Sequence, residues 1–234
     1  MKSLEFKIYK DPNECGNLYK NTKVTINEGL TVLVGCNGSG KTTLLLQILE
    51  DCRLNKIPFV HFNNLTDGGS SSSSYLGFIG DFEGMAYNLT SSEGEQIYTD
   101  FGRFSSKIAK AIRGDWKKKV FWKDEEEITP ITDLVVLIDA LDSGLSIDNA
   151  IEIKEFIKDI VFKDAENNNV TLYMIAVANA YELARGENCL DLWTGEYITF
   201  KDYEDYRKYI LSTRKRKDRR INNYTKKMEK LKNR

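Results

Sequence analysis

Eight consecutive residues of this chain, 35 to 42, have the types and spacing that bind phosphate groups. They follow the pattern G-x-x-x-x-G-K-[ST] of a phosphate-binding loop, or P-loop. The residues are Gly35, Cys36, Asn37, Gly38, Ser39, Gly40, Lys41 and Thr42. With average residue usage, this pattern arises by accident in about one chain in a hundred of this length. The pattern therefore indicates a nucleoside triphosphate as the ligand.

Each part of the P-loop has a physical role in holding a triphosphate. The glycines let backbone N–H groups curl around the phosphates, and the helix that starts at Thr43 adds the partial positive charge of its N-terminus. In this pattern Lys41 reaches the β- and γ-phosphates, and the Thr42 hydroxyl ligates Mg²⁺. The mechanism requires a strand before the loop and a helix after it, and the apolar run from Leu30 to Val34 predicts that strand.

The rest of the chain predicts an α/β fold with a mainly parallel sheet flanked by helices. Residues 134–138 and 171–178 are continuous apolar runs, which is typical of buried parallel strands. Between them, apolar residues from 151 to 161 recur at helical spacing, with Ser146 or Asp148 as the helix N-cap. Strand, helix and strand in this order form a parallel unit.

Two alternating segments before the P-loop, residues 6–9 and 23–26, predict a β-rich N-terminal entry. Later in the chain, apolar side chains from 97 to 112 fall on one face of a helix that begins near Ser92. We read their aromatic members as core residues.

Charge is distributed unevenly along the chain, and this divides it into two parts. Residues 211–234 contain eleven Lys/Arg and two Asp/Glu, whereas residues 1–210 contain 23 basic and 33 acidic side chains. We therefore expect a nucleotide-binding domain over 1–210 and a basic C-terminal tail over 211–234.

Composition also argues against several classes of protein. The four cysteines are scattered and His61 is the one histidine, so neither a zinc site nor a disulfide framework is supported. The N-terminus lacks the apolar segment of a signal peptide, and no apolar run approaches the roughly 18 residues of a membrane span. We therefore expect no membrane span and a cytoplasmic protein.

The order of these motifs resembles that of the ATP-binding-cassette (ABC) ATPases, particularly the soluble SMC/RecF-like group, whose heads often read G-x-N-G-S-G-K-T. The resemblance covers most of residues 4 to 200 and implies ATP with Mg²⁺ as cofactors. It implies that Asp139, at the end of an apolar run, holds the Mg²⁺ shell through water. Lys41 and Asp139 are therefore the expected catalytic residues, and Thr42 and Asp139 the expected metal ligands.

Residues 89–96 resemble the signature motif of this family, in which a Ser and a Gly contact the γ-phosphate bound to a second subunit. Ser92 and Gly94 match best, while Glu93 replaces the usual Gly. Ser92 with Glu95 also forms an ordinary capping box, and both interpretations can hold together. Residues 143–146 resemble the D-loop, which lies along the dimer interface in the family, although Ser146 replaces its usual Asp.

Two departures from the family pattern concern hydrolysis. Ala140 stands where the family places the glutamate that polarises the attacking water, and Asn179 stands where a histidine contacts the γ-phosphate. Asn can donate a hydrogen bond but cannot titrate. The loss of one general base typically removes about 10² to 10⁴ in rate. We therefore expect ATP to bind and to turn over slowly.

Several residues near these motifs have two interpretations. The carboxylates of Asp81, Glu83 and Asp142 either assist Mg²⁺ or water, or lie in loops and on the surface. Tyr9 and Tyr19 either stack on adenine or pack elsewhere.

Three hypotheses about function follow. The first is an ATP-dependent homodimer that hydrolyses ATP slowly or acts as a switch. Ser92 follows Lys41 by only 51 positions, so this ATP-binding head lacks the coiled-coil arm of SMC proteins. The second is a nucleic-acid-binding accessory protein that acts through residues 212–234, whose basic run can neutralise several phosphates; a solvated helix is the alternative. The third is a pseudo-ATPase subunit that supports a larger partner chain.

Overall fold

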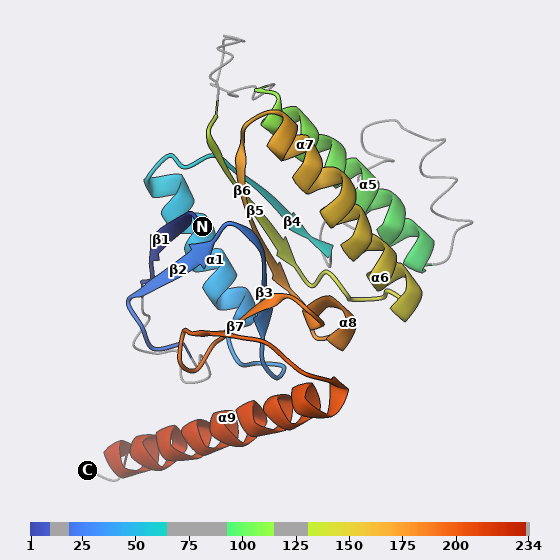
Figure 1. The fold of residues 1–234 in the computed structure, drawn as a ribbon. Coiled ribbons are helices and arrows are strands. Elements are labelled where there is room, and N and C mark those ends of the chain that lie inside the picture. The colour runs from blue at the N-terminus through green and yellow to red at the C-terminus, as the bar shows by residue number, and fades with distance from the viewer. Residues whose placement is uncertain (10–18, 65–92, 115–130, 233–234) are drawn as a thin grey trace, which may run out of the picture.

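The computed structural model of the chain describes residues 1–9, 19–64, 93–114 and 131–232 (Figure 1). Within this part, six strands form the main sheet in the order β4-β5-β6-β3-β7-β8, and β1 pairs with β2 in a separate antiparallel ribbon. The strands are β1 (Ser3–Lys7), β2 (Lys23–Asn27), β3 (Gly29–Val34), β4 (Phe59–Asn63), β5 (Asp133–Asp139), β6 (Thr171–Val177), β7 (Asn188–Asp191) and β8 (Tyr197–Ile198). All neighbours in the main sheet are parallel except β7 and β8. The predicted α/β fold with a β-rich entry is confirmed.

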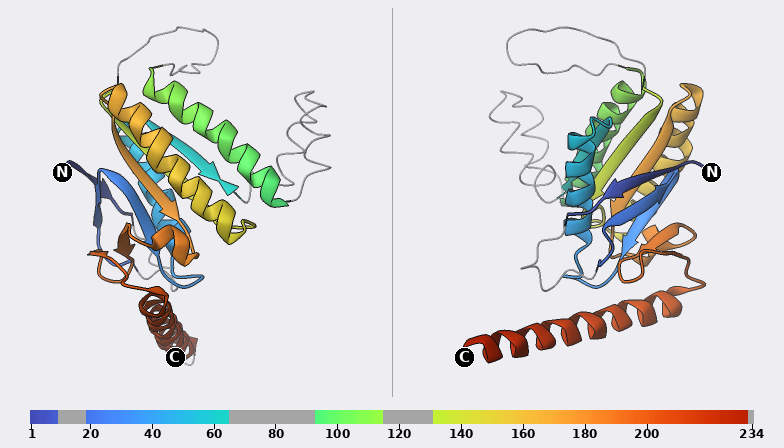
Figure 2. Two further views of the ribbon diagram at one scale, coloured as in Figure 1. Left: turned by 45° about the vertical axis from the view of Figure 1, so that its right-hand side comes forward. Right: turned by 90° about the vertical axis from the view of Figure 1, so that its left-hand side faces the viewer.

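Helices cover both faces of the main sheet. They are α1 (Lys41–Leu54), α5 (Glu93–Ile112), α6 (Ile147–Phe156), the π-helical turn η1 (Ile157–Val161), α7 (Phe162–Asn167), α8 (Tyr181–Ala184) and α9 (Tyr203–Lys232). Helix α1 and the β1–β2 ribbon lie on one face, whereas α5, α6, η1 and α7 lie on the other (Figures 1 and 2). The chain is therefore layered as helices, sheet, helices.

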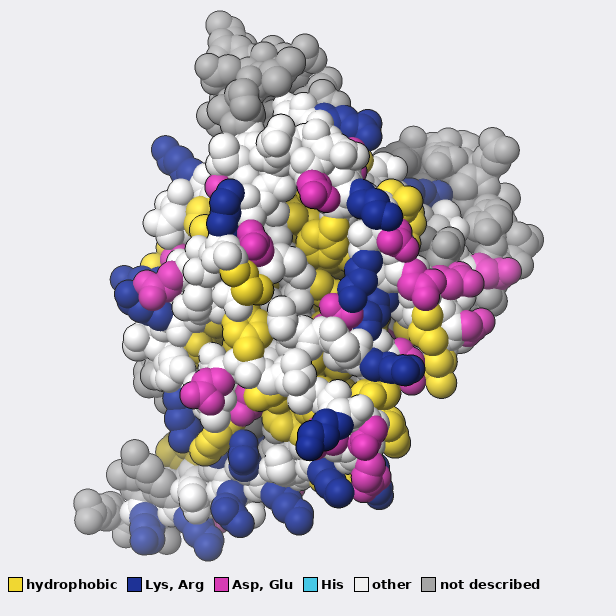
Figure 3. All heavy atoms as spheres, viewed as in Figure 1, with side chains coloured by type: hydrophobic (Ala, Val, Ile, Leu, Met, Phe, Trp, Pro, Cys, Tyr) yellow, Lys and Arg dark blue, Asp and Glu magenta, His cyan; other side chains and the backbone are white. Residues whose placement is uncertain are grey.

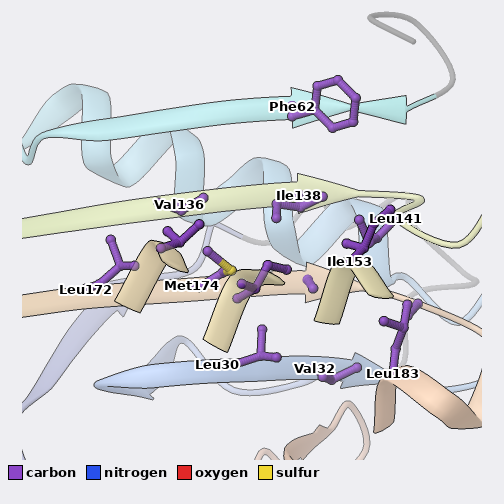
Figure 4. Packing of buried hydrophobic residues seen from close by; sticks show 14 of the residues in the cluster. Leu30, Val32, Phe62, Val136, Ile138, Leu141, Ile153, Leu172, Met174 and Leu183 are labelled. Carbon is purple, nitrogen blue, oxygen red and sulfur yellow. The ribbon is translucent and has the colours of Figure 1, made fainter. Parts of the chain in front are cut away.

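Alternation along the strands fills a separate core on each face. In β5, Val135 packs with α1 on one side, while Val136 packs with α5 and α6 on the other. Figure 4 shows the second cluster, to which both Met174 of β6 and Ile153 of α6 belong. Because both faces are covered, β5 is buried along nearly its whole length, as its continuous apolar run predicts.

The connection from β5 to β6 is helical, as the sequence predicts, and begins at the expected cap. The Ser146 side chain accepts a hydrogen bond from the backbone N–H of Asn149, which satisfies one amide of the first turn of α6. Ile153, Ile157 and Val161 point into the core at steps of four, while Ile160 is exposed. The crossover therefore buries one stripe of its apolar residues.

Helix α9 belongs to neither helical layer and packs across the end of the sheet where β3 leads into the P-loop (Figure 1). It begins at Tyr203, so the basic residues from 211 onward continue a helix that starts earlier in the chain. The boundary expected between 210 and 211 falls inside this helix. No helix in the described part of the chain is both long and apolar enough to cross a membrane.

Candidate functional site

The P-loop connects the buried end of β3 to the first residue of α1, as its sequence predicts. Gly38 and Gly40 have φ values of 72° and 98°, a left-handed region that favours glycine. A Cβ atom on Gly35 would lie 2.7 Å from Ser39 Oγ, so this position also needs glycine. Gly40 is the N-cap of α1 and offers no side-chain cap, so the first amides of the helix remain free for an anion.

Lys41 is held inside the loop and faces its carbonyl groups. Lys41 is only 6% exposed, and burial lowers the pKa of its ammonium group. Its Nζ donates to the carbonyl oxygens of Gly35 at 2.8 Å and Cys36 at 3.4 Å, and to Asn179 Oδ1 at 3.0 Å. The structure therefore brings Asn179, which follows β6, to the predicted phosphate-binding lysine.

Thr42 and Asp139 meet where α1 starts and β5 ends. Thr42 Oγ1 donates to Asp139 Oδ1 at 3.0 Å, and the same oxygen accepts the N–H of Ala140 at 3.0 Å. Asp139 is only 3% exposed. Mg²⁺ in nucleotide sites is held by one or two protein oxygens together with phosphate and water oxygens, and this pair offers such oxygens.

One buried polar atom inside the loop has no partner among the described residues. Ser39 is 1% exposed, and its Oγ forms no hydrogen bond with any described group. A buried hydroxyl without a hydrogen-bond partner costs free energy, so this position favours a ligand that can accept a hydrogen bond from it. The unpaired Ser39 hydroxyl and the glycine turns both fit a phosphate group.

Asp142 has a positioning role that the sequence did not reveal. Its Oδ2 accepts the backbone N–H groups of Asn179 at 2.6 Å and Ala180 at 2.5 Å. The carboxylate therefore fixes the segment that presents the Asn179 side chain to Lys41. Ala140, two positions before Asp142, takes a φ of 52°, which is a left-handed backbone conformation directly after Asp139.

The two tyrosines considered for base stacking differ in their surroundings. Tyr19 is buried and its hydroxyl donates to the carbonyl of Lys23 at 2.6 Å, so its ring belongs to the core. Tyr9 is 45% exposed and borders a groove of about 470 Å³ along α1, which Thr43 and Leu46 also line. Of the two rings, Tyr9 is the one a ligand can reach.

Helix α9 contributes four contacts to this site, none of which the sequence analysis anticipated. The hydroxyl of Tyr206 donates to the carbonyl of Asn179 at 2.6 Å, and that of Tyr209 lies 3.2 Å from the carbonyl oxygen of Val34. The N–H of Cys36 donates to Thr213 Oγ1 at 3.0 Å, and Lys217 Nζ donates to the carbonyl of Asn37 at 2.8 Å. The contacting residues of α9 are Tyr206, Tyr209, Thr213 and Lys217, spaced three, four and four apart, which is the spacing of one helix face.

The signature-like segment is only partly described. Ser92 lies outside the described residues, as do Asp81 and Glu83, while Gly94 lies in the first turn of α5. The D-loop-like turn is held by the residue that follows β4, because Asn64 Nδ2 donates to the carbonyl groups of Ala140 and Ser143. The described part of the site therefore consists of the P-loop, the strand ends of β5 and β6, and α9.

Comparisons with known proteins assign no family to this chain. No model of a known protein family matches the sequence, and no curated protein matches it. Among solved structures, a nucleotide-free ATP-binding cassette from an ABC transporter is similar over 90% of this chain and 94% of its own. Its sequence identity is 14% and its TM-score is 0.46, a similarity too low to assign a family or a function.

Proposed function

We propose that this chain is an ATP-binding head of ABC type that uses Mg²⁺ and hydrolyses ATP slowly. The observation that carries the proposal is the convergence at one loop of a buried lysine, a Thr–Asp pair and left-handed glycines. Each feature meets a different requirement of triphosphate binding. The lysine supplies positive charge for the phosphates, the Thr–Asp pair supplies oxygen ligands for Mg²⁺, and the glycines let the backbone approach the phosphates closely.

In this proposal Lys41 holds the terminal phosphates, and Thr42 with Asp139 holds the Mg²⁺ that accompanies them. Among the described residues there is no group of three or more His, Cys, Asp and Glu side chains that could hold a metal alone. The metal is therefore expected to bind with the nucleotide, because phosphate oxygens complete its ligand set. Bound Mg²⁺ would neutralise negative charge that develops on the phosphates.

Slow turnover follows from the side chains around the attacking-water position. Ala140 cannot accept a proton, and Asp142 is engaged by the amides of Asn179 and Ala180. Asn179 can donate a hydrogen bond to phosphate but cannot carry charge. The proposed product of binding is therefore a long-lived ATP state, which suits a switch better than a rapid hydrolase.

Nucleotide titration tests the binding claim. A fluorescent ATP analogue with Mg²⁺ should bind the intact chain, and Lys41→Ala should weaken binding by at least a hundredfold. Lys110→Ala, on the exposed side of α5, is the matched control and should bind like wild type. Equal affinity in Lys41→Ala and Lys110→Ala would refute the proposed site.

Turnover separates a slow ATPase from a pseudo-ATPase subunit, the main alternative. A low rate of ATP turnover in wild type that Lys41→Ala abolishes supports a slow ATPase. No rate in wild type, with a gain in Ala140→Glu, supports a switch head that lacks only its general base. Position 140 accepts this change at modest cost, because Ala already adopts the left-handed φ there and Glu is not β-branched.

The proposal includes an ATP-dependent homodimer in which Ser92 and Gly94 of one subunit face the phosphates of the other. Support comes from the motif resemblance and from the place of Gly94 in the first turn of α5, where helix amides suit an anion. Sedimentation should show a monomer without nucleotide and a dimer with ATP and Mg²⁺. A monomer under both conditions would reject the dimer while leaving nucleotide binding intact.

A second candidate function is nucleic-acid binding through residues 212–234. The chain would then act in the cytoplasm, alone or with a larger partner chain. The supporting observation is the row of basic side chains along α9 (Figure 3). Arg214, Lys215 and Arg219 are exposed, while the opposite face of the helix docks on the P-loop. Salt-dependent DNA retention should fall when Arg214, Lys215 and Arg219 are changed to Gln together, and unchanged retention would exclude this candidate.

A further inference from the structure

Lys217 differs from the other basic residues of α9 in where its ammonium group lies. Its Nζ donates to the carbonyl of Asn37 at 2.8 Å, and a Cβ atom built on Gly38 would lie 3.5 Å from the same nitrogen. Both contacts fall on variable positions of the P-loop. A cation from the C-terminal helix therefore touches the loop proposed to hold the triphosphate.

Two neighbouring contacts hold the helix in this position. Tyr209 contacts Val34 and Thr213 contacts Cys36, three and one positions before Asn37 along the chain. Thr213 is 1% exposed. Because Lys217 follows Thr213 by one helical turn, docking of this helix face delivers its side chain to the loop.

Two ammonium groups approach the carbonyl groups of the loop. Lys41 and Lys217 both donate to P-loop carbonyls, and no described carboxylate forms an ion pair with either. Burial is the largest cause of the lowered pKa of Lys41; the nearby carboxylates of Asp142 and Asp139 oppose this shift, and the charge of Lys217 adds to it. The two cations repel each other, and a bound polyanion would attract both and so offset this repulsion.

We propose that Lys217 is a second phosphate-binding cation, supplied by α9 of the same chain, and that it makes docking of α9 and triphosphate binding mutually stabilising. This inference rests on the proposed ATP site. The carbonyl of Asn37 takes one of the three ammonium donors, which leaves two for phosphate oxygens. Coupling is reciprocal, so a nucleotide that binds better to the docked form also holds α9 down.

Substitutions at Lys217 separate charge from simple helix docking. Lys217→Ala removes both the charge and the bond to Asn37, whereas Lys217→Gln keeps a donor for that carbonyl and removes only the charge. ATP affinity, measured with Mg²⁺ by calorimetry, should fall roughly five- to thirtyfold in both variants. Lys217→Arg should recover most of the loss. Lys208→Ala, on the exposed face of the same helix, is the control and should change affinity less than twofold.

Hydrogen exchange of the α9 amides provides a second readout. ATP with Mg²⁺ should slow exchange over residues 206–220 in wild type, and this protection should be smaller in Lys217→Gln. Full affinity in Lys217→Gln would overturn the inference, because the residue would then act only in docking. Faster exchange of α9 on ATP addition would overturn it too, because the nucleotide would then displace the helix. If wild type itself fails to bind ATP, the proposed function fails first. If wild type binds ATP and both Lys217 variants bind it as tightly as wild type, only the inference fails.

Discussion

Tyr209 joins α9 to the end of β3, and its hydroxyl provides the sharpest test of how firmly the helix docks. The oxygen lies 2.8 Å from Asp191 Oδ1 and 3.2 Å from the carbonyl oxygen of Val34. Burial and the nearby Asp191 carboxylate raise the pKa of this hydroxyl, so its proton stays in place over the whole range of assay pH. Tyr209→Phe removes this donor and leaves the ring.

The expected loss can be worked from these partners. A hydrogen bond to a charged acceptor contributes about 1.5 to 3 kcal/mol net. Asp191 keeps the N–H of Trp193 at 2.9 Å and the hydroxyl of Thr194 at 3.0 Å, so it is not left unpaired and the lower end applies. A loss of about 1.5 kcal/mol should lower the melting temperature of a chain of this size by roughly 3 to 6 °C.

Thermal unfolding followed by circular dichroism measures this change. Tyr203→Phe is the matched control, because Tyr203 lies in the same helix, is exposed and touches Tyr181 only through its ring. It should change the melting temperature by less than 1 °C. Equal melting temperatures for the two variants would refute the reasoning, since α9 would then not unfold together with the domain.

Asp142→Ala should weaken ATP binding at least fivefold in the same calorimetric assay, because the two amides that this carboxylate holds are released; Asp159→Ala, at an exposed carboxylate, should not. The free energy of unfolding should fall as pH rises from about 9 to 12, because burial raises the pKa of both Cys52 and Cys189 to about 12. The folded chain then binds more protons than the unfolded chain in that window, so stability decreases with pH; urea titrations at pH 8, 9 and 10 measure the slope, which Cys52→Ala should flatten. Gly38→Ala should cost about 1 to 2 kcal/mol because Ala is strained at a φ of 72°, and an unchanged urea midpoint would contradict the loop geometry.

The parts of the site that lie on strand ends could be predicted from the sequence. Parallel strands place their carboxyl ends at one edge of a sheet, so a P-loop after one strand and Asp139 at the end of another had to approach each other. The same rule brings Asn179, after β6, to Lys41. These contacts follow from topology, and topology follows from the order of apolar runs.

The contacts of α9 could not be predicted in this way. The charge of residues 211–234 indicates a solvated or polyanion-binding segment, and nothing local shows that one face returns to the P-loop 177 residues away. The spacing of Tyr206, Tyr209, Thr213 and Lys217 is helical, but mixed hydroxyl and ammonium groups do not predict burial. The positioning role of Asp142 could not be predicted for a related reason, because its partners are backbone amides, which leave no mark in the sequence.

Because α9 is long, a tilt at its contact with the P-loop would move its far end. Thirty helical residues extend about 45 Å, and the part beyond Lys217 extends about 22 Å from the docked half. A tilt of about 10° at the P-loop would therefore displace the far end by roughly 4 Å. The helix would thus carry a small rearrangement of the P-loop to its distant C-terminal end.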